Sequence, residues 1–236
     1  MERAYPSFRI NSFQEAHAFY IDFLGFEVYF EWREAPDAPV YMGISKGSLA
    51  IHLFEHKIGL YGASAVLDVK DAFEVYEELV KKKPDMIEKL IDQPWGKSEL
   101  HLRDPFGNKL NFTSGTTPTD TIVRAIPVLR IGNYEEAVSY YVDYLGFRIN
   151  FEWRHHANFP IYMGISKGDL ALHLTEHEGD VHFGTGTLMD VDNISLLYKD
   201  LLNRKPKMTE ELINQPWKKT ELHLRDPFEN LLIFTS

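Results

Sequence analysis

The sequence contains no cysteine, no long apolar run and an excess of acidic over basic residues. Without cysteine, the chain cannot form disulfides, thiolate zinc sites, iron–sulfur clusters or a cysteine nucleophile. No stretch reaches the roughly 18 apolar residues of a membrane span, and the first residues lack the apolar core of a signal peptide, which predicts a cytoplasmic protein. The net charge of −10 would repel nucleic acid and anionic membranes, and it favours a cationic ligand.

What the 236 residues do contain is a duplication. Residues 16–26 (AHAFYIDFLGF) align with residues 137–147 (AVSYYVDYLGF), and the run YMGISKG at residues 41–47 recurs at 162–168. One residue is gained further along, after which ELHLRDPF at residues 99–106 meets the same run at 221–228. The sequence therefore predicts two domains, residues 1–114 and 122–236, joined by the small, polar, proline-bearing linker 115–121.

Each copy repeats one pattern of apolar spacing twice. Apolar residues recur at helical spacing from Phe13 to Leu24 until Gly25 ends the helix, and alternating residues on either side indicate strands. The second pattern has its helix before Pro84. We expect an α+β fold of four βαβββ units in two repeats, with the first copy's strands at residues 7–10, 26–32, 41–45, 49–54, 65–69, 99–102 and 109–113.

Two motifs in this order resemble a known family. The segment Phe19-Tyr20…Leu24-Gly25-Phe26 near the start and Asp104-Pro105-Phe106-Gly107-Asn108 near the end are similar to the vicinal oxygen chelate superfamily. This superfamily includes glyoxalase I, extradiol ring-cleaving dioxygenases and bleomycin resistance proteins. Trp32-Arg33, Tyr41 and residues 52–56 look most like its glyoxalase/bleomycin-resistance branch. The resemblance implies curved eight-stranded sheets whose clefts hold either a metal with its substrate or a drug.

The resemblance also implies where metal ligands would stand. These positions are occupied by Tyr5, His52, Ser64 and Asn111 in the first copy and by Ile126, His173, Gly186 and Ile233 in the second. A divalent site needs three or four histidine or carboxylate donors, and each copy offers one histidine. We therefore expect no metal and no other cofactor.

A competing zinc motif overlaps these histidines. Residues 52–56 and 173–177 both match H-x-x-E-H, the inverted zincin signature, which requires a helix. Leu49, Ile51 and Leu53 instead alternate with other residues as in a strand, where positions four apart are separated by about 13 Å. We interpret the match as fortuitous.

The aromatic content of 14% is sufficient to line a large apolar pocket. The candidate ligand-binding residues are the histidines of the strands, the four tryptophans and the two arginines that follow the first tryptophan of each copy: His52, His173, Trp32, Trp153, Trp95, Trp217, Arg33 and Arg154. Each also has a structural interpretation, as a packed histidine, a sheet edge or a loop that plugs the core. Glu55 with His56, and Glu176 with His177, are expected to form ion-paired strand ends. Asp104 and Asp226 are expected to form turns.

These observations favour a metal-free protein, similar to bleomycin resistance proteins, that sequesters a cationic aromatic antibiotic or metabolite without transforming it. The fused copies would act as an intrachain pseudo-dimer, and two chains could also pair as a homodimer. One alternative is a metal-dependent lyase, isomerase or dioxygenase that uses His52, Glu55 or His101. Another is that only one copy binds; the second copy, with Glu229 where the family turn has glycine, is then the structural partner.

Overall fold

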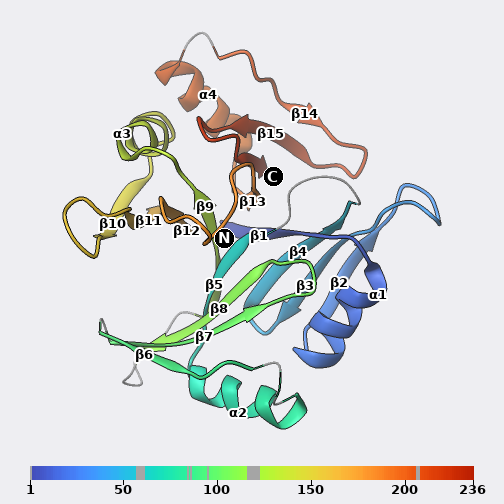
Figure 1. Cartoon of the computed structure of the whole chain (residues 1–236). Helices are drawn as coiled ribbons and strands as arrows, with labels where there is room; N and C mark the ends of the chain where they lie inside the picture. The colour runs from blue at the N-terminus through green and yellow to red at the C-terminus, as the bar shows by residue number, and fades with distance from the viewer. Residues whose placement is uncertain are drawn as a thin grey trace. The chain divides into compact units, whose positions relative to one another are not determined.

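The computed structural model describes residues 2–56, 62–83, 85, 87–94, 96–115, 123–205 and 208–236 (Figure 1). It divides into two compact units, one formed by Pro6–Ile126 (unit 2) and the other by Met1–Tyr5 with Pro127–Ser236 (unit 1). Of the predicted linker, Gly115 ends a strand and residues 116–121 lie outside the described residues. The boundaries between the two units therefore lie within the first strand of each repeat.

The predicted βαβββ order is confirmed in both repeats, and the hydrogen-bonded strands form two eight-stranded sheets. The first repeat comprises β1 (Arg3–Ile10), α1 (Phe13–Ala16), the π-helix η1 (His17–Phe23), β2 (Glu27–Trp32), β3 (Tyr41–Lys46), β4 (Leu49–Glu55), β5 (Ser64–Asp68), α2 (Ala72–Lys82), β6 (Ile91–Gln93), β7 (Lys97–Arg103) and β8 (Lys109–Gly115). Its strands are ordered β1-β4-β3-β2 and β5-β8-β7-β6.

The second repeat has the same arrangement. It comprises β9 (Arg124–Arg130), α3 (Tyr134–Ala137), the π-helix η3 (Val138–Tyr144), β10 (Arg148–Trp153), β11 (Tyr162–Lys167), β12 (Leu170–Thr175), β13 (Gly186–Asp190), α4 (Ile194–Arg204), β14 (Ile213–Asn214), β15 (Thr220–Arg225) and β16 (Leu231–Thr235). Its strands are ordered β9-β12-β11-β10 and β13-β16-β15-β14.

The first residues of β1 and β9 belong to the unit that contains the other repeat. Within unit 1, the Thr187 hydroxyl of β13 donates to the Tyr5 carbonyl at 3.0 Å, and the Tyr5 hydroxyl donates to Asp190 at 3.1 Å. Within unit 2, Arg124 forms an ion pair with Asp68 of β5 at 3.3 Å. Unit 1 thus includes the first residues of the first repeat, and unit 2 includes the first residues of the second repeat.

Alternation along the strands separates a core face from a second face. In β4, Leu49, Ile51 and Leu53 belong to the buried core of unit 2, together with Phe19 and Tyr20 of η1. A strand directs successive side chains to opposite faces, so the residues between these leucines and isoleucine, including His52, lie on the face away from that core. No helix among the described residues is long and apolar enough to cross a membrane.

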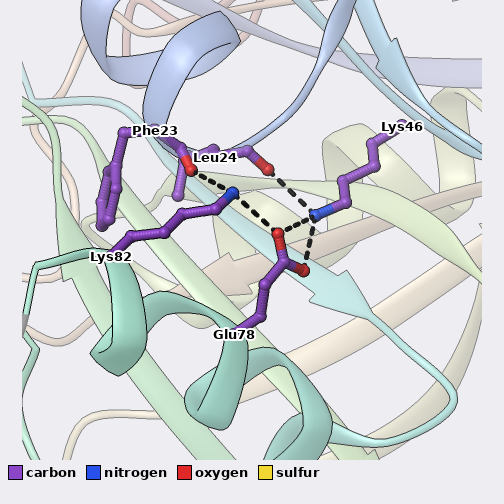
Figure 2. A network of polar contacts seen from close by, with 5 residues as sticks. All are labelled: Phe23, Leu24, Lys46, Glu78 and Lys82. Carbon is purple, nitrogen blue, oxygen red and sulfur yellow. Dashed lines mark hydrogen bonds and ion pairs between the residues drawn. The ribbon is translucent and has the colours of Figure 1, made fainter.

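Lysines attach the π-helix of unit 2 to α2 (Figure 2). The Lys46 ammonium donates to the Leu24 carbonyl at 2.9 Å, and that of Lys82 donates to the Phe23 carbonyl at 2.9 Å. The two ammonium groups approach the Glu78 carboxylate from different sides, at 3.0 and 2.8 Å (Figure 2). Burial acts to raise the pKa of Glu78, but the hydrogen bonds from Lys82 and Lys46 outweigh it and lower that pKa. The contacts satisfy carbonyls that a helix end leaves unpaired.

The Asp-Pro-Phe-Gly-Asn segment forms a closed polar turn, as predicted for Asp104. One Asp104 oxygen accepts from the backbone N–H groups of Phe106 at 2.9 Å and Asn108 at 2.7 Å, and the other accepts from the Tyr20 hydroxyl at 2.7 Å. Burial raises the pKa of Asp104, and the hydrogen bonds oppose that effect. Asp226 makes the same set of contacts in unit 1, so both aspartates serve the fold.

Candidate functional site

A β-bulge places two aromatic side chains against His52 in unit 2. The register of β2 on β3 shifts between Val28 and Phe30, so Tyr29 is the extra residue of the bulge. As a result, successive residues of β2 both reach the histidine: the ring centroids of Tyr29 and Phe30 lie 6.2 and 5.3 Å from that of His52. A regular strand would have directed them to opposite faces.

His52 itself is held between two tyrosine hydroxyls. Its Nε2 lies 2.6 Å from the Tyr29 hydroxyl, and its Nδ1 lies 2.6 Å from the Tyr41 hydroxyl on β3. The side chain is 5% exposed, and burial lowers its pKa to about 4. The imidazole is therefore neutral at pH 7, with one ring nitrogen donating a hydrogen bond and the other accepting one.

Unit 1 contains a related arrangement around His173. The register of β10 on β11 shifts between Ile149 and Phe151, and the Phe151 ring packs edge-on against His173 with centroids 5.3 Å apart. The Tyr162 hydroxyl lies 2.8 Å from His173 Nδ1. Asn150 stands where unit 2 has the bulge tyrosine, and its side-chain oxygen accepts from Ser166 at 3.0 Å. The two histidines thus share one tyrosine contact and one aromatic neighbour but differ at the bulge.

A glycine opposite each histidine allows the aromatic rings to lie over the sheet. Gly43 pairs with His52, and Gly164 pairs with His173. A Cβ atom at Gly43 would overlap the rings of Tyr29 and Phe30, and one at Gly164 would overlap Phe151. Any larger residue would therefore displace the rings from the strand.

The residues present do not fit a family-type metal site. Both ring nitrogens of His52 already contact tyrosine hydroxyls at 2.6 Å, so neither has a lone pair directed at an ion. The Glu55 carboxylate accepts from the Val40 N–H at 3.2 Å, and His101 Nε2 lies 3.0 Å from Glu99. In the part of the chain that the structure describes, no three His, Cys, Asp or Glu side chains are grouped to hold a metal.

The H-x-x-E-H segments begin in strands, as predicted, and their last residues follow the strand ends. Residues 49–55 form β4 and residues 170–175 form β12. The zincin interpretation of these segments therefore fails on geometry, because the two histidines of the motif cannot be helical neighbours.

The structure places the two predicted arginines in the loops that follow β2 and β10. The Arg33 guanidinium donates to the Ala38 carbonyl at 2.9 Å and to Glu31 at 3.0 Å, and it lies over the Phe13 ring at 5.0 Å. Arg154 donates to the Phe159 carbonyl at 2.6 Å and lies 3.4 Å from Glu176. These contacts hold the loops in place, and a role of either arginine in ligand binding stays a prediction.

The predicted tryptophans differ in their surroundings. Trp32 ends β2 and is 45% exposed, and Trp217 is 49% exposed in the loop after β14. Trp153 packs against the rings of His155 and His177, with centroids 4.2 and 6.4 Å away. Trp95 lies outside the described residues.

Sequence reasoning missed the residues that surround the two histidines. Tyr29, Phe30 and Phe151 stand at the bulges, and Tyr41 and Tyr162 supply the hydroxyl groups. The repeated run YMGISKG carried a signal, because it holds both tyrosines and both glycines. The sequence carries no comparable indication of the bulges, because a bulge adds one residue to a strand without changing which residue types the strand contains.

Comparison with known proteins shows the following similarities. The sequence model described as "Glyoxalase superfamily protein" matches residues 1–119 and 115–236. Maize glyoxalase I has a TM-score of 0.74 at 13% identity, over 100% of this chain and 92% of its own. A bleomycin resistance determinant encoded on transposon Tn5 has a TM-score of 0.39 at 24% identity, over 48% of this chain and 96% of its own. No curated protein matches the sequence. At 13% identity, the maize structure is informative about the fold alone.

Proposed function

This chain belongs to the glyoxalase superfamily, and on that premise we propose that it is a metal-free binding protein for a small cationic aromatic molecule. The observation that carries the proposal is the position of His52, whose two ring nitrogens are both engaged by tyrosine hydroxyls where the family's metal enzymes place a ligand. The proposed role is capture of an antibiotic or metabolite, as in the bleomycin resistance proteins that the sequence resembles.

Aromatic surface close to each histidine supports a flat ligand. In unit 2, Tyr29 is 49% exposed and Trp32 45% exposed, and in unit 1 Phe151 is 44% exposed. Exposed aromatic side chains that border a buried polar group are typical of small-molecule sites, which combine stacking surfaces with a few fixed hydrogen-bonding groups. The glycine opposite each histidine leaves room for these rings over the neighbouring strand.

The net charge supports the cationic part of the proposal. A charge of −10 raises the local concentration of cations and speeds their association, and an aromatic face attracts a cation directly. Affinity for such a ligand should fall as salt is added, because salt screens the interaction between charges.

Calorimetric titration of the purified chain with bleomycin, and with the cationic dye ethidium, tests the proposal. We expect binding that weakens with salt. Trp32→Ala and Phe151→Ala should each lower the affinity about five- to thirtyfold, since a buried aromatic contact contributes roughly 1–2 kcal/mol. Phe73→Ala is the matched control, because Phe73 is an exposed aromatic residue of α2 (54%). Absence of binding by both probes would reject the ligand class.

Elemental analysis of the same preparation tests the metal-free part separately. Stoichiometric zinc, nickel, manganese or iron would contradict it and would favour the alternative of a metal-dependent lyase, isomerase or dioxygenase. Loss of that metal in His52→Ala would then identify the site.

A further inference from the structure

The residues that line a pocket beside the π-helix of unit 1 differ from the aligned residues of unit 2 in one consistent way. The pocket has a volume of about 300 Å³ and is lined by Glu136, Ser139, Tyr140, Tyr144, Lys205 and Pro227. The aligned residues of the first repeat are Glu15, Ala18, Phe19, Phe23, Lys83 and Pro105. The glutamate, lysine and proline are the same in both repeats, and each of the other three positions carries a hydroxyl group in the second repeat alone.

The scaffold around these positions is otherwise retained. Lys83 lies 5.2 Å from the Phe23 ring in unit 2, and Lys205 lies 5.5 Å from the Tyr144 ring in unit 1. Phe23 is 3% exposed and belongs to the core, whereas Tyr144 is partly exposed and donates to the Met208 sulfur at 2.8 Å. Phe19 and Phe23 thus belong to the apolar core of unit 2, whereas the tyrosines at the aligned positions line an accessible pocket in unit 1.

The Tyr140 hydroxyl lacks a hydrogen-bond partner within the described residues. The Tyr140 side chain is partly buried, and its ring packs against Tyr144 at 5.6 Å between centroids. Burial, reinforced by the charge of Asp226, strongly raises the pKa of Tyr140, so the group remains a neutral donor and acceptor. The hydroxyl is reached by solvent, so a ligand hydroxyl in the pocket would replace water as its hydrogen-bond partner.

The charges around the pocket select against ions. Lys205 and Glu136 contribute one charge of each sign to the lining, and Glu210 acts on both tyrosines. Within the lining, a free anion would meet the Glu136 carboxylate, and a free cation would meet the Lys205 ammonium. A ligand hydroxyl, by contrast, can both donate to and accept from the groups that line the pocket.

We propose that this pocket of unit 1 binds a small neutral polyol of monosaccharide size. Its volume lies at the lower end of the range of about 300–1,000 Å³ for small-molecule sites. The site is separate from the aromatic faces around His52 and His173, so it does not depend on the function proposed above.

Saturation-transfer NMR on the full chain tests this proposal with D-glucose, D-galactose, D-mannose, sorbitol and myo-inositol as probes. We expect saturation transfer to at least one probe, and perturbation of the Tyr140 and Tyr144 resonances in a tyrosine-labelled sample. The triple variant Ser139→Ala/Tyr140→Phe/Tyr144→Phe carries the residues of the first repeat and should fold. Each lost hydrogen bond is expected to weaken binding by roughly two- to tenfold. Tyr76→Phe in α2 is the matched control, since it removes a tyrosine hydroxyl in unit 2.

Each result decides for or against the proposal. Transfer that the triple variant abolishes and Tyr76→Phe retains would support it. Absence of transfer to all five probes, or transfer that the triple variant retains, would overturn it. Displacement of a bound polyol by inorganic phosphate would also overturn it, because the pocket would then be an anion site.

Discussion

The pH dependence of folding should report directly on His52. The residue is 5% exposed, both ring nitrogens contact tyrosine hydroxyls, and burial lowers its pKa from 6.5 to about 4. Above pH 6.5 the group is neutral in both the folded and the unfolded chain, so the full stability is present. Between pH 6.5 and 4 the unfolded chain binds a proton that the folded chain does not, and the free energy of unfolding falls as the pH is lowered.

The size of the effect follows from the difference between the two pKa values. At about 1.4 kcal/mol per pH unit, the drop from 6.5 to about 4 corresponds to a loss of about 3 kcal/mol between pH 7 and pH 4. Well below pH 4 both states are protonated at this residue, and His52 contributes no further change. A loss of this size is a substantial part of the stability of an ordinary domain, which is about 5–15 kcal/mol.

Urea denaturation at pH 7, 6, 5 and 4 measures the loss, with His52→Gln as the comparison. Glutamine keeps a hydrogen-bonding side chain but does not titrate, so the variant lacks the His52 contribution. Asp104 and Asp226, whose pKa values are raised by burial, are common to both proteins, and their contributions cancel in the difference. His17→Gln in η1, where the side chain is 43% exposed, is the matched control.

We expect the wild-type chain to lose about 3 kcal/mol more than His52→Gln over this pH range. Parallel pH profiles for the two proteins would refute the reasoning, because they would mean that His52 titrates alike in the folded and unfolded states. An NMR titration that placed the His52 pKa near 6.5 would refute it independently.

Three further predictions concern glycines and ion pairs. Glu229 has a positive φ of 66°, so Glu229→Gly should raise the free energy of unfolding by about 0.5–1 kcal/mol in urea denaturation, and unchanged or lower stability would contradict this strain argument. Gly43→Ala and Gly164→Ala should each reduce the affinity for bleomycin measured by calorimetry, since a Cβ would displace the aromatic rings. Wild-type affinity in both variants would count against the rings around His52 and His173 as binding surfaces. Glu78→Gln should lower the free energy of unfolding by about 1 kcal/mol or less at low salt and by less at high salt, because the side chain is 42% exposed and salt screens its ion pairs. A loss of stability that did not vary with salt would show that the ion pairs are not its cause.

Much of the fold could be predicted from the sequence because its signals are local and appear twice. The helix from Phe13 ends where Gly25 adopts a positive φ of 75°, as expected, and the strand period around Leu53 identified β4 against the helical zincin motif. The prediction of an ordinary helix was incomplete, since its second part is the π-helix η1. β6, with three residues, was missed because so short a strand shows no alternation.

The candidate site was predicted only in part. His52 and His173 were selected from the sequence, and both lie among aromatic residues on the face away from the core. Arg33 was selected because it follows a tryptophan, but its guanidinium contacts the adjoining loop. The sequence could not show that a bulge directs Tyr29 to the same histidine as Phe30, because register depends on the partner strand.

The sequence by itself determined the duplication and the βαβββ order, since both depend on which residues occur and at what spacing. Only the tertiary structure decided which groups contact His52 and that its pKa lies near 4. It also decided that Tyr140 lines a pocket in unit 1, whereas the aligned Phe19 is buried in unit 2. Hydrogen bonds between strands and the burial of a side chain depend on segments far apart in the chain. Neither can be read from local spacing.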